Sequence, residues 1–289
     1  MKTLRIRHFT RYRYDRPVTF GRHRLMLRPR DGHDMRLLES RLVVEPTADI
    51  RWAFDTFGNS IALLTFQEPA DTLSIESELK IERYGLEEAV REFEPHAGSY
   101  PFSYDEDDQI DLAPMLRIQC PDDETTVRTW LDEALPERPD VSLHVLDALS
   151  SAIHDSFEYR RRDEEGVQSP GETIRTASGT CRDFAFLFME AARQLGFASR
   201  FVTGYLYDPA ADGGDGLTGG GATHAWADVF VPGVGWMEFD PTNEIVAGHE
   251  LIRVATTRTP AQAQPVNGTF SGEGTPLGME VEVTVSAEN

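Results

Sequence analysis

Two strand-like segments joined by a short turn constrain the fold of this chain most strongly. Residues 224–231 and 234–239 have strand patterns, and the Pro-Gly-Val-Gly sequence at 232–235 is typical of a hairpin turn. Because so short a turn favours antiparallel pairing, the start of the first strand lies beside the end of the second. His224 begins the first strand and Asp240 ends the second, so we expect an imidazole and a carboxylate to face each other.

A helical pattern with a cysteine at its start precedes this hairpin. Apolar residues recur at helical spacing from Cys181 to Leu195. Thr180 or Ser178 can cap this helix, and Gly196 can end it. A helix N-terminus carries free N–H groups and a partial positive charge, which favour a thiolate and can hold an oxyanion. Cys181 therefore stands where a nucleophile is activated, although burial as a small apolar residue is the commoner role of a lone cysteine.

The histidine and the aspartate also have ordinary structural interpretations. A lone histidine such as His224 is more often a core or surface residue, and an aspartate before a proline, as in Asp240-Pro241, commonly starts a turn. Their joint placement favours chemistry, because an orienting carboxylate fixes the imidazole tautomer and supports the imidazolium. If the helix that begins at Cys181 packs its N-terminus against these strand ends, the three side chains form a nucleophile, a base and an orienting acid.

The order of the patterns divides the chain and indicates an α+β fold. Residues 1–84 contain short alternating strands, which predict a β-sandwich or barrel-like module, and the acidic residues 85–112 are expected to be a linker. Residues 113–248 contain helices followed by antiparallel strands, so we expect a core of helices packed on an antiparallel sheet. The strand patterns in residues 249–289 are expected to pack back on the core or on the N-terminal module.

The net charge excludes some classes of partner. It is −21 over 289 residues, from 49 Asp and Glu against 28 Lys and Arg. A surface this acidic repels phosphate backbones and anionic lipids, so we expect neither nucleic acid nor a membrane as a partner. A peptide or protein substrate is the partner we expect, and the oligomeric state stays open.

The two cysteines and the first ten residues indicate which cofactors to expect and in which cellular compartment the protein acts. The chain has only two cysteines, fewer than a disulfide framework would use, and the absence of a C-x-x-C pair disfavours a thiolate zinc site. We assign Cys120 to structure. Residues 212–216 lack the distal glutamate of a calcium loop, so we expect residues 208–221 to form a lid and the protein to need no metal or other cofactor. The first ten residues carry basic side chains and no apolar run, which predicts a cytoplasmic protein.

Further motifs surround the three candidate residues. They are Gly179-Thr180-Cys181-Arg182-Asp183-Phe184-Ala185, Arg200-Phe201-Val202-Thr203-Gly204-Tyr205, His224-Ala225-Trp226, Gly235-Trp236-Met237-Glu238-Phe239-Asp240-Pro241-Thr242 and, near the start, Leu27-Arg28-Pro29 and Phe57-Gly58-Asn59. In this order and spacing they resemble the bacterial transglutaminase-like family, including its N-terminal β domain. The resemblance implies a papain-like transglutaminase core of the kind found in candidate cysteine proteases. It also implies cysteine-dependent acyl transfer by Cys181, His224 and Asp240.

The residues leave three functions open. Hydrolysis of a peptide or amide bond through a thioester is favoured, transfer of the acyl group to an amine would be a protein-glutamine transglutaminase reaction, and an interaction module on the same fold would not be catalytic. The aromatic candidates for substrate binding are Tyr159, Trp226 and Trp236, with a place in the core as the alternative. Asp183, in the first helical turn, is expected to interact with the helix dipole and not to catalyse.

Overall fold

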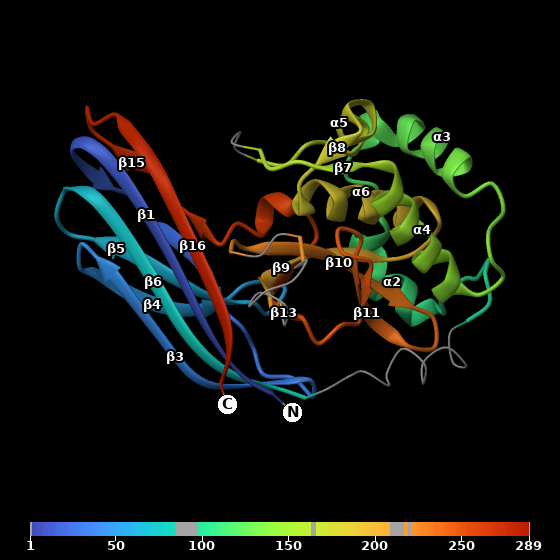
Figure 1. Ribbon diagram of the computed structural model, residues 1–289, viewed down its shortest axis with the longest axis horizontal. Coiled ribbons are helices and arrows are strands. Elements are labelled where there is room, and N and C mark those ends of the chain that lie inside the picture. Colours follow the sequence, from blue (N-terminus) through green and yellow to red (C-terminus); the bar gives the residue numbers. More distant parts are fainter. Residues whose placement is uncertain (1, 85–97, 163–165, 209–216, 219–220, 289) are drawn as a thin grey trace.

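The computed structural model describes residues 2–84, 98–162, 166–208, 217–218 and 221–288. Two halves lie side by side in Figure 1: strands from both ends of the chain form one half, and helices packed on a sheet form the other. Within the described ranges, no helix is both long and apolar enough to cross a membrane. The fold is α+β, as the sequence predicts.

The first half is a β half-barrel made of two sheets. Its first sheet has the order β15 (Phe270–Ser271), β1 (Lys2–Phe20), β6 (Ala70–Arg83) and β3 (Met35–Glu45), and β16 (Pro276–Glu288) also pairs with β1. Its second sheet has the order β14 (Val266–Asn267), β2 (His23–Arg28), β5 (Ser60–Phe66) and β4 (Ala48–Phe54). All of these pairings are antiparallel.

Strand periodicity explains the core of this half. In β6 every second residue is buried, including Leu73 and Ile75, while the residues between them are more exposed. These side chains meet Val18 of β1 and Leu25 and Leu64 of the second sheet in one apolar cluster. The alternation therefore places one face of each sheet inside the half-barrel.

The second half has one antiparallel sheet with helices on one face. The sheet order is β12 (Ile245–Val246), β11 (Gly235–Asp240), β10 (His224–Val231), β9 (Ser199–Leu206) and β13 (Leu251–Thr257). The helices are α3 (Glu124–Ala134), α4 (Ser142–Ser156), α5 (Pro170–Thr176) and α6 (Cys181–Gln194). Phe188 of α6 stacks on Phe239 of β11 with ring centroids 5.5 Å apart, and both are fully buried. The central helix is thus packed directly on the predicted hairpin, in which Val231 pairs with Gly235.

The segment expected to be a linker includes the start of a helix. Residues 106–112 belong to α2 (Glu106–Leu116), whose N-cap Asp105 accepts a hydrogen bond from the Asp108 N–H at 2.8 Å. Acidic residues favour the first turn because the N-terminal end of the helix dipole is positive. The acidic run is therefore a helix start, and residues 85–97 of the same range lie outside the described residues.

The two halves share a buried apolar contact. Leu4 and Ile6 of β1 pack against Tyr205 of β9 and Ile252 of β13, and all four are at most 2% exposed. The C-terminal segment contributes to both halves, because β13 pairs with β9 while β16 pairs with β1. The half-barrel and the helical half therefore bury surface against each other.

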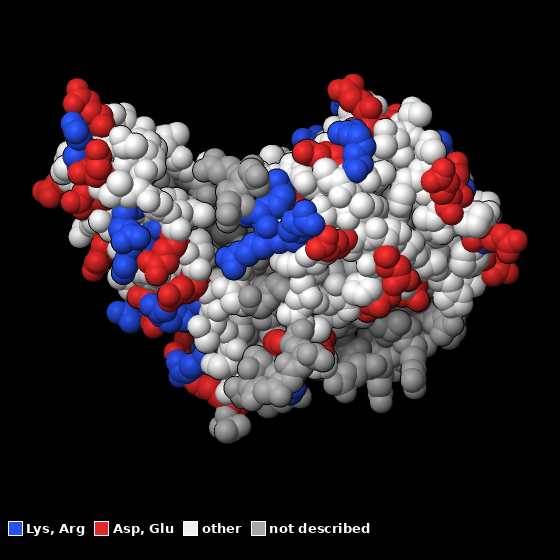
Figure 2. Space-filling model, turned by 45° about the horizontal axis from the view of Figure 1, so that its top comes forward, with Lys and Arg blue, Asp and Glu red and all other residues white. Residues whose placement is uncertain are grey.

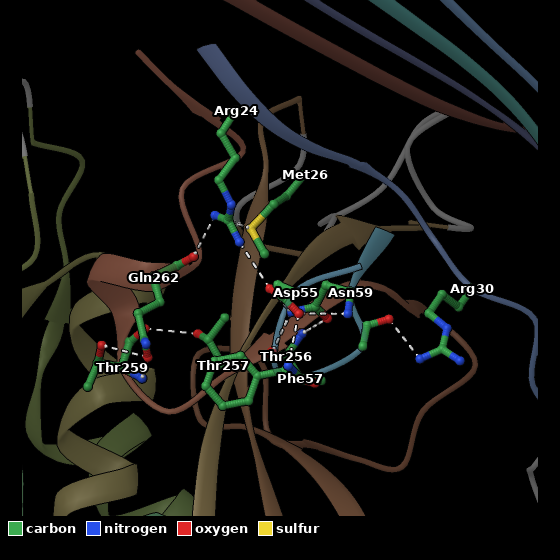
Figure 3. A network of polar contacts seen from close by, with 11 residues as sticks. Arg24, Met26, Arg30, Asp55, Phe57, Asn59, Thr256, Thr257, Thr259 and Gln262 are labelled. Atoms are coloured by element: carbon green, nitrogen blue, oxygen red, sulfur yellow. Dashed lines mark hydrogen bonds and ion pairs between the residues drawn. The ribbon is translucent and has the colours of Figure 1, made fainter. Parts of the chain in front are cut away.

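A polar network fixes the same junction at the turn between β4 and β5 (Figure 3). The buried Asn59 amide donates to the Thr256 carbonyl at 2.7 Å and accepts from the Thr256 N–H at 2.9 Å. The same amide donates to the Asp55 carboxylate at 3.0 Å, and that carboxylate also accepts a hydrogen bond from Arg24 at 3.0 Å. Asn59 thus pairs with β13 as another strand would.

Replacing Asn59 by alanine is expected to lower the free energy of unfolding by about 2–4 kcal/mol. Three hydrogen bonds are lost, and the Thr256 N–H and C=O are left buried without partners. Urea denaturation measures the effect. The matched control is Gln67→Ala, an exposed polar residue whose loss should change stability by less than about 0.5 kcal/mol. Equal stability of the two variants would contradict this role for Asn59.

Candidate active site

The thiol of Cys181 lies at the N-terminal end of the central helix. Before it the chain is extended: β8 (Ser178–Gly179) pairs in parallel with β7 (Glu158–Tyr159), and Thr180 is the N-cap with φ −93° and ψ 173°. The helix begins at Cys181, so the N–H of this residue has no intrahelical acceptor. Cys181 is 5% exposed. A negative charge on or beside the sulfur would therefore meet free N–H groups and the positive end of the helix dipole.

The carboxylate of Asp183 holds this helix start in place. It accepts hydrogen bonds from the Thr180 N–H and hydroxyl, at 2.8 and 2.9 Å, and from the Gln168 N–H at 2.7 Å. Arg162 donates to both carboxylate oxygens at 3.2 Å, and Asp183 is fully buried. The sequence indicated only a partner for the helix dipole. The Thr-x-x-Asp spacing, which is that of a capping box, is the signal that could have predicted more.

His224 and Asp240 are in direct contact, as the hairpin predicts. His224 Nε2 lies 2.7 Å from Asp240 Oδ2, and the two residues are 1% and 0% exposed. Ala227 pairs with Phe239, so Asp240 lies diagonally across from His224 and not directly opposite. The contact is between side chains with almost no access to water, so the charge of the carboxylate acts on the imidazole with little screening.

Thr242 and Asn243, whose role the sequence alone did not indicate, hold the carboxylate of Asp240. The Thr242 N–H donates to Asp240 Oδ1 at 3.0 Å, and the Asn243 amide donates to Oδ2 at 2.8 Å. Asn243 also bonds both backbone groups of Thr218, at 2.8 and 3.1 Å. The bond from Thr242 is that of an Asx-turn, so Asp240 both starts a turn and binds the imidazole. The Asp-Pro-Thr-Asn sequence could have predicted this turn.

The electrostatics of His224 favour the imidazolium. Burial by itself lowers the pKa of His224, but the charges of Asp240 and Cys181 outweigh burial and raise this pKa to about 10. Asp240 occupies Nε2, whereas Nδ1 is buried without a hydrogen-bond partner of good geometry among the described residues. Cys181 nevertheless acts on the imidazole, so Nδ1 is the nitrogen available to exchange a proton with the thiol.

Of the three aromatic candidates, Tyr159 lies near the thiol. It is 36% exposed, and its ring meets Phe184 of α6 edge to face, with centroids 6.4 Å apart. Burial raises the pKa of Tyr159 to about 12, and the charge of Cys181 adds to this effect. The Tyr159 hydroxyl is therefore within electrostatic range of Cys181, and the residue is partly open to solvent.

The two tryptophans have different surroundings: the Trp226 ring lies 6.0 Å from the His224 imidazole, centroid to centroid, and Trp236 lies at the far end of the sheet. Trp226 is fully buried, and its indole N–H donates to Glu238 at 3.2 Å, so it has no exposed surface with which to contact a substrate. Trp236 is the second residue of β11, at the opposite end from Asp240, and the Arg200 guanidinium lies 3.9 Å from its ring centroid. Both rings stabilise the sheet and its far end.

The surface of the molecule is hollowed between the two halves. Figure 2 shows basic side chains gathered in the middle of that hollow, while acidic and basic side chains are mixed elsewhere on this face. Most of the predicted lid at 208–221, including the acidic residues 212 and 215, lies outside the described residues. In the part of the chain that is described, no cluster of three His, Cys, Asp or Glu side chains could hold a metal ion.

Comparison with known proteins identifies the family. Residues 4–82 match the bacterial transglutaminase-like N-terminal region, and residues 132–241 match the transglutaminase-like superfamily. An uncharacterized protein of Mycobacterium tuberculosis is 30% identical over 295 residues, which cover 96% of this chain and 91% of that protein. The chain belongs to the transglutaminase-like superfamily.

Other relatives of this transglutaminase-like protein agree. An uncharacterized protein of Mycobacterium leprae is 27% identical over 289 residues, covering 98% of this chain and 99% of its own. The crystal structure of a candidate cysteine protease from Cytophaga hutchinsonii superimposes with a TM-score of 0.76 at 19% identity, covering 100% of this chain and 91% of the other. At this identity the likeness shows the shared fold alone. The predicted family and both of its regions are thus confirmed.

Proposed function

We propose that this protein is a cysteine-dependent acyl-transfer enzyme that hydrolyses a peptide or amide bond, with Cys181, His224 and Asp240 as its catalytic residues. The observation that carries the proposal is the buried 2.7 Å contact between His224 and Asp240 next to a thiol at a helix N-terminus. This combination is the requirement for nucleophilic catalysis by cysteine: a base that can take the thiol proton and a carboxylate that orients the base.

The reaction follows from these positions. His224 Nδ1 takes the proton of Cys181, and the thiolate attacks the carbonyl carbon of the amide. The Cys181 N–H then stabilises the oxyanion. As the C–N bond breaks, the imidazolium gives its proton to the leaving amine, and a thioester remains. Water, deprotonated by His224, attacks the thioester, and release of the carboxylic acid restores the thiol.

Asp240 acts through the imidazole. Its bond to Nε2 fixes the ring so that Nδ1 is directed away from Asp240, and its charge supports the imidazolium that forms in each half of the cycle. Thr242 and Asn243 hold the carboxylate for this task. Tyr159, which is partly exposed, is the proposed substrate contact.

An assay with competing acceptors tests the proposal. Casein is incubated with the enzyme in ¹⁸O-water containing dansylcadaverine, and the products are analysed by mass spectrometry. Hydrolysis gives Cys181-dependent ¹⁸O in new carboxylates, at cleaved peptide bonds or at glutamines converted to glutamate. Cys181→Ala should lower this activity by about 10³-fold or more. Cys120→Ser is the matched control and should keep it.

The other possible results of this assay distinguish the alternative functions. Dansylcadaverine incorporation that exceeds ¹⁸O incorporation would favour the transglutaminase reaction, because the triad serves either acceptor. Product formation that persists in Cys181→Ala would overturn the assignment of the nucleophile. A lack of any product would leave the interaction-module alternative, which the thiol reactivity described below distinguishes from an enzyme without its preferred substrate.

A further inference from the structure

The edge strand β4 exposes an apolar stripe. In the sheet order β14-β2-β5-β4, this strand is last, and within the described residues it pairs only with β5. Ile50, Trp52 and Phe54 alternate along it and are 39, 46 and 72% exposed. Residues two apart in a strand share a face, so these side chains form one continuous stripe beside unpaired backbone groups.

This stripe continues the inner face of the half-barrel. Ile50 lies opposite Leu64 and Trp52 opposite Ala62, and both of these β5 residues are buried. The face that is covered at β5 is therefore uncovered at β4. Edge strands and exposed apolar patches of this kind are usually protected, because they invite pairing with another chain.

The edge of the opposite sheet is protected in the usual way. Along β3 the side chains of Arg36, Glu39, Arg41 and Glu45 are all exposed, so charge discourages pairing there. On β4, by contrast, the charges Asp49 and Arg51 lie on the other face from the stripe. Arg28 and Arg30 lie over the rings of Trp52 and Phe54, at 5.7 and 5.5 Å from the ring centroids, and both rings stay exposed.

We infer that β4 pairs antiparallel with β4 of a second copy of this chain, about a two-fold axis at Ile50. In this register Asp49 of each copy faces Arg51 of the other, and Ala48 faces Trp52. The two exposed stripes then form one apolar strip on the same face of a continuous sheet. Because a two-fold axis repeats each contact, the opposite-charge pair occurs twice.

Charge complementarity selects both the partner and the register. Among registers that keep both stripes on one face, an axis at Asp49 or at Arg51 would place like charges opposite each other, which is unfavourable. An axis at Trp52 would leave neither charge facing its opposite within the strand. Residues 48–52, five of the seven in β4, are thus self-complementary about Ile50, which an unrelated peptide would have to match by its own sequence.

Charge reversal combined with sedimentation velocity tests the inference. The full-length protein is measured from about 1 to about 200 µM at roughly 0.15 M salt, where repulsion between exposed charges is largely screened. The variants are Asp49→Arg, Arg51→Asp and the double exchange Asp49→Arg/Arg51→Asp. Arg128→Asp, at an exposed arginine of α3, is the matched control with the same change of net charge as Arg51→Asp. Cys181 alkylation in every variant verifies that the fold is intact.

The expected pattern separates the cross-strand contact from a general charge effect. The wild type and Arg128→Asp should dimerise alike, each single reversal on β4 should weaken dimerisation by about tenfold, and the double exchange should restore it. A wild type that stays monomeric over the whole range would overturn the inference and favour an unrelated extended peptide as the occupant of β4. Dimerisation that the single reversals leave unchanged would also overturn it.

Discussion

Replacing Asp183 by alanine is expected to lower the free energy of unfolding by about 3–5 kcal/mol, because it leaves the partly buried Arg162 and the backbone N–H groups of Thr180 and Gln168 without their buried acceptor. The carboxylate receives five hydrogen bonds, two from Arg162, two from Thr180 and one from the Gln168 N–H. Arg162 loses its only carboxylate among the described residues, and the N-cap loses the group that holds it. Because Cys181 is the first residue of α6, the reactivity of the thiol should fall together with stability.

Urea unfolding and the rate of alkylation by iodoacetamide measure the two effects in the same protein. Glu172→Ala is the matched control, because Glu172 is also an acid in the first turn of a helix, α5, but is exposed. Its loss removes an interaction with the helix dipole and should cost about 0.3–1 kcal/mol. If Asp183→Ala cost no more than Glu172→Ala, the carboxylate would be only a dipole partner, as the sequence alone indicated.

Local patterns predict the elements that carry the candidate site. The helix from Cys181 and the hairpin with His224 and Asp240 are set by apolar periodicity and a four-residue turn, which act within a few residues. The hairpin register brings His224 and Asp240 to diagonal positions on neighbouring strands, and their side chains make the contact across that diagonal. Sequence therefore sufficed for the part of the site in which local structure decides geometry.

Long-range packing accounts for what the sequence did not predict. Trp226 shares a strand face with His224, but whether that face is open depends on distant elements, and Leu251 of β13 packs against it. The pairing of β1 with β16 joins residues near the two ends of the chain, such as Leu4 and Ala287, and no local signal specifies such a pair. The acidic start of α2 has the composition of a linker, and its capping by Asp105 distinguishes it.

Replacing His224 by alanine is expected to lower the rate of Cys181 alkylation at pH 6 by about 10²-fold. The thiolate is the reactive form, and a free cysteine, with a pKa of about 8.5, is less than about 1% thiolate at pH 6. In the wild type, the pKa of His224 is raised to about 10 by Asp240 and Cys181 acting against burial, so the imidazolium persists through neutral pH. A cation beside the sulfur stabilises the thiolate, and the alanine variant lacks that cation.

The other cysteine gives little background to this measurement. Cys120 is half-buried, and burial, with Glu190 as the next contribution, raises the pKa of Cys120 to about 11. It should react slowly below pH 8, and a Cys120→Ser protein removes its contribution altogether. Asp240→Asn in this background should reduce the low-pH reactivity less than His224→Ala, because the imidazole remains but its cation is less favoured.

The most direct test of the account is therefore the pH profile of iodoacetamide alkylation between pH 5 and 10, measured on Cys120→Ser with and without His224→Ala. We expect alkylation of Cys181 to persist well below pH 7 and His224→Ala to shift the profile to that of a free thiol, with a midpoint of about 8.5. Two superimposable profiles, both with the free-thiol midpoint, would contradict this expectation: the thiol and the imidazole would then form no reactive pair.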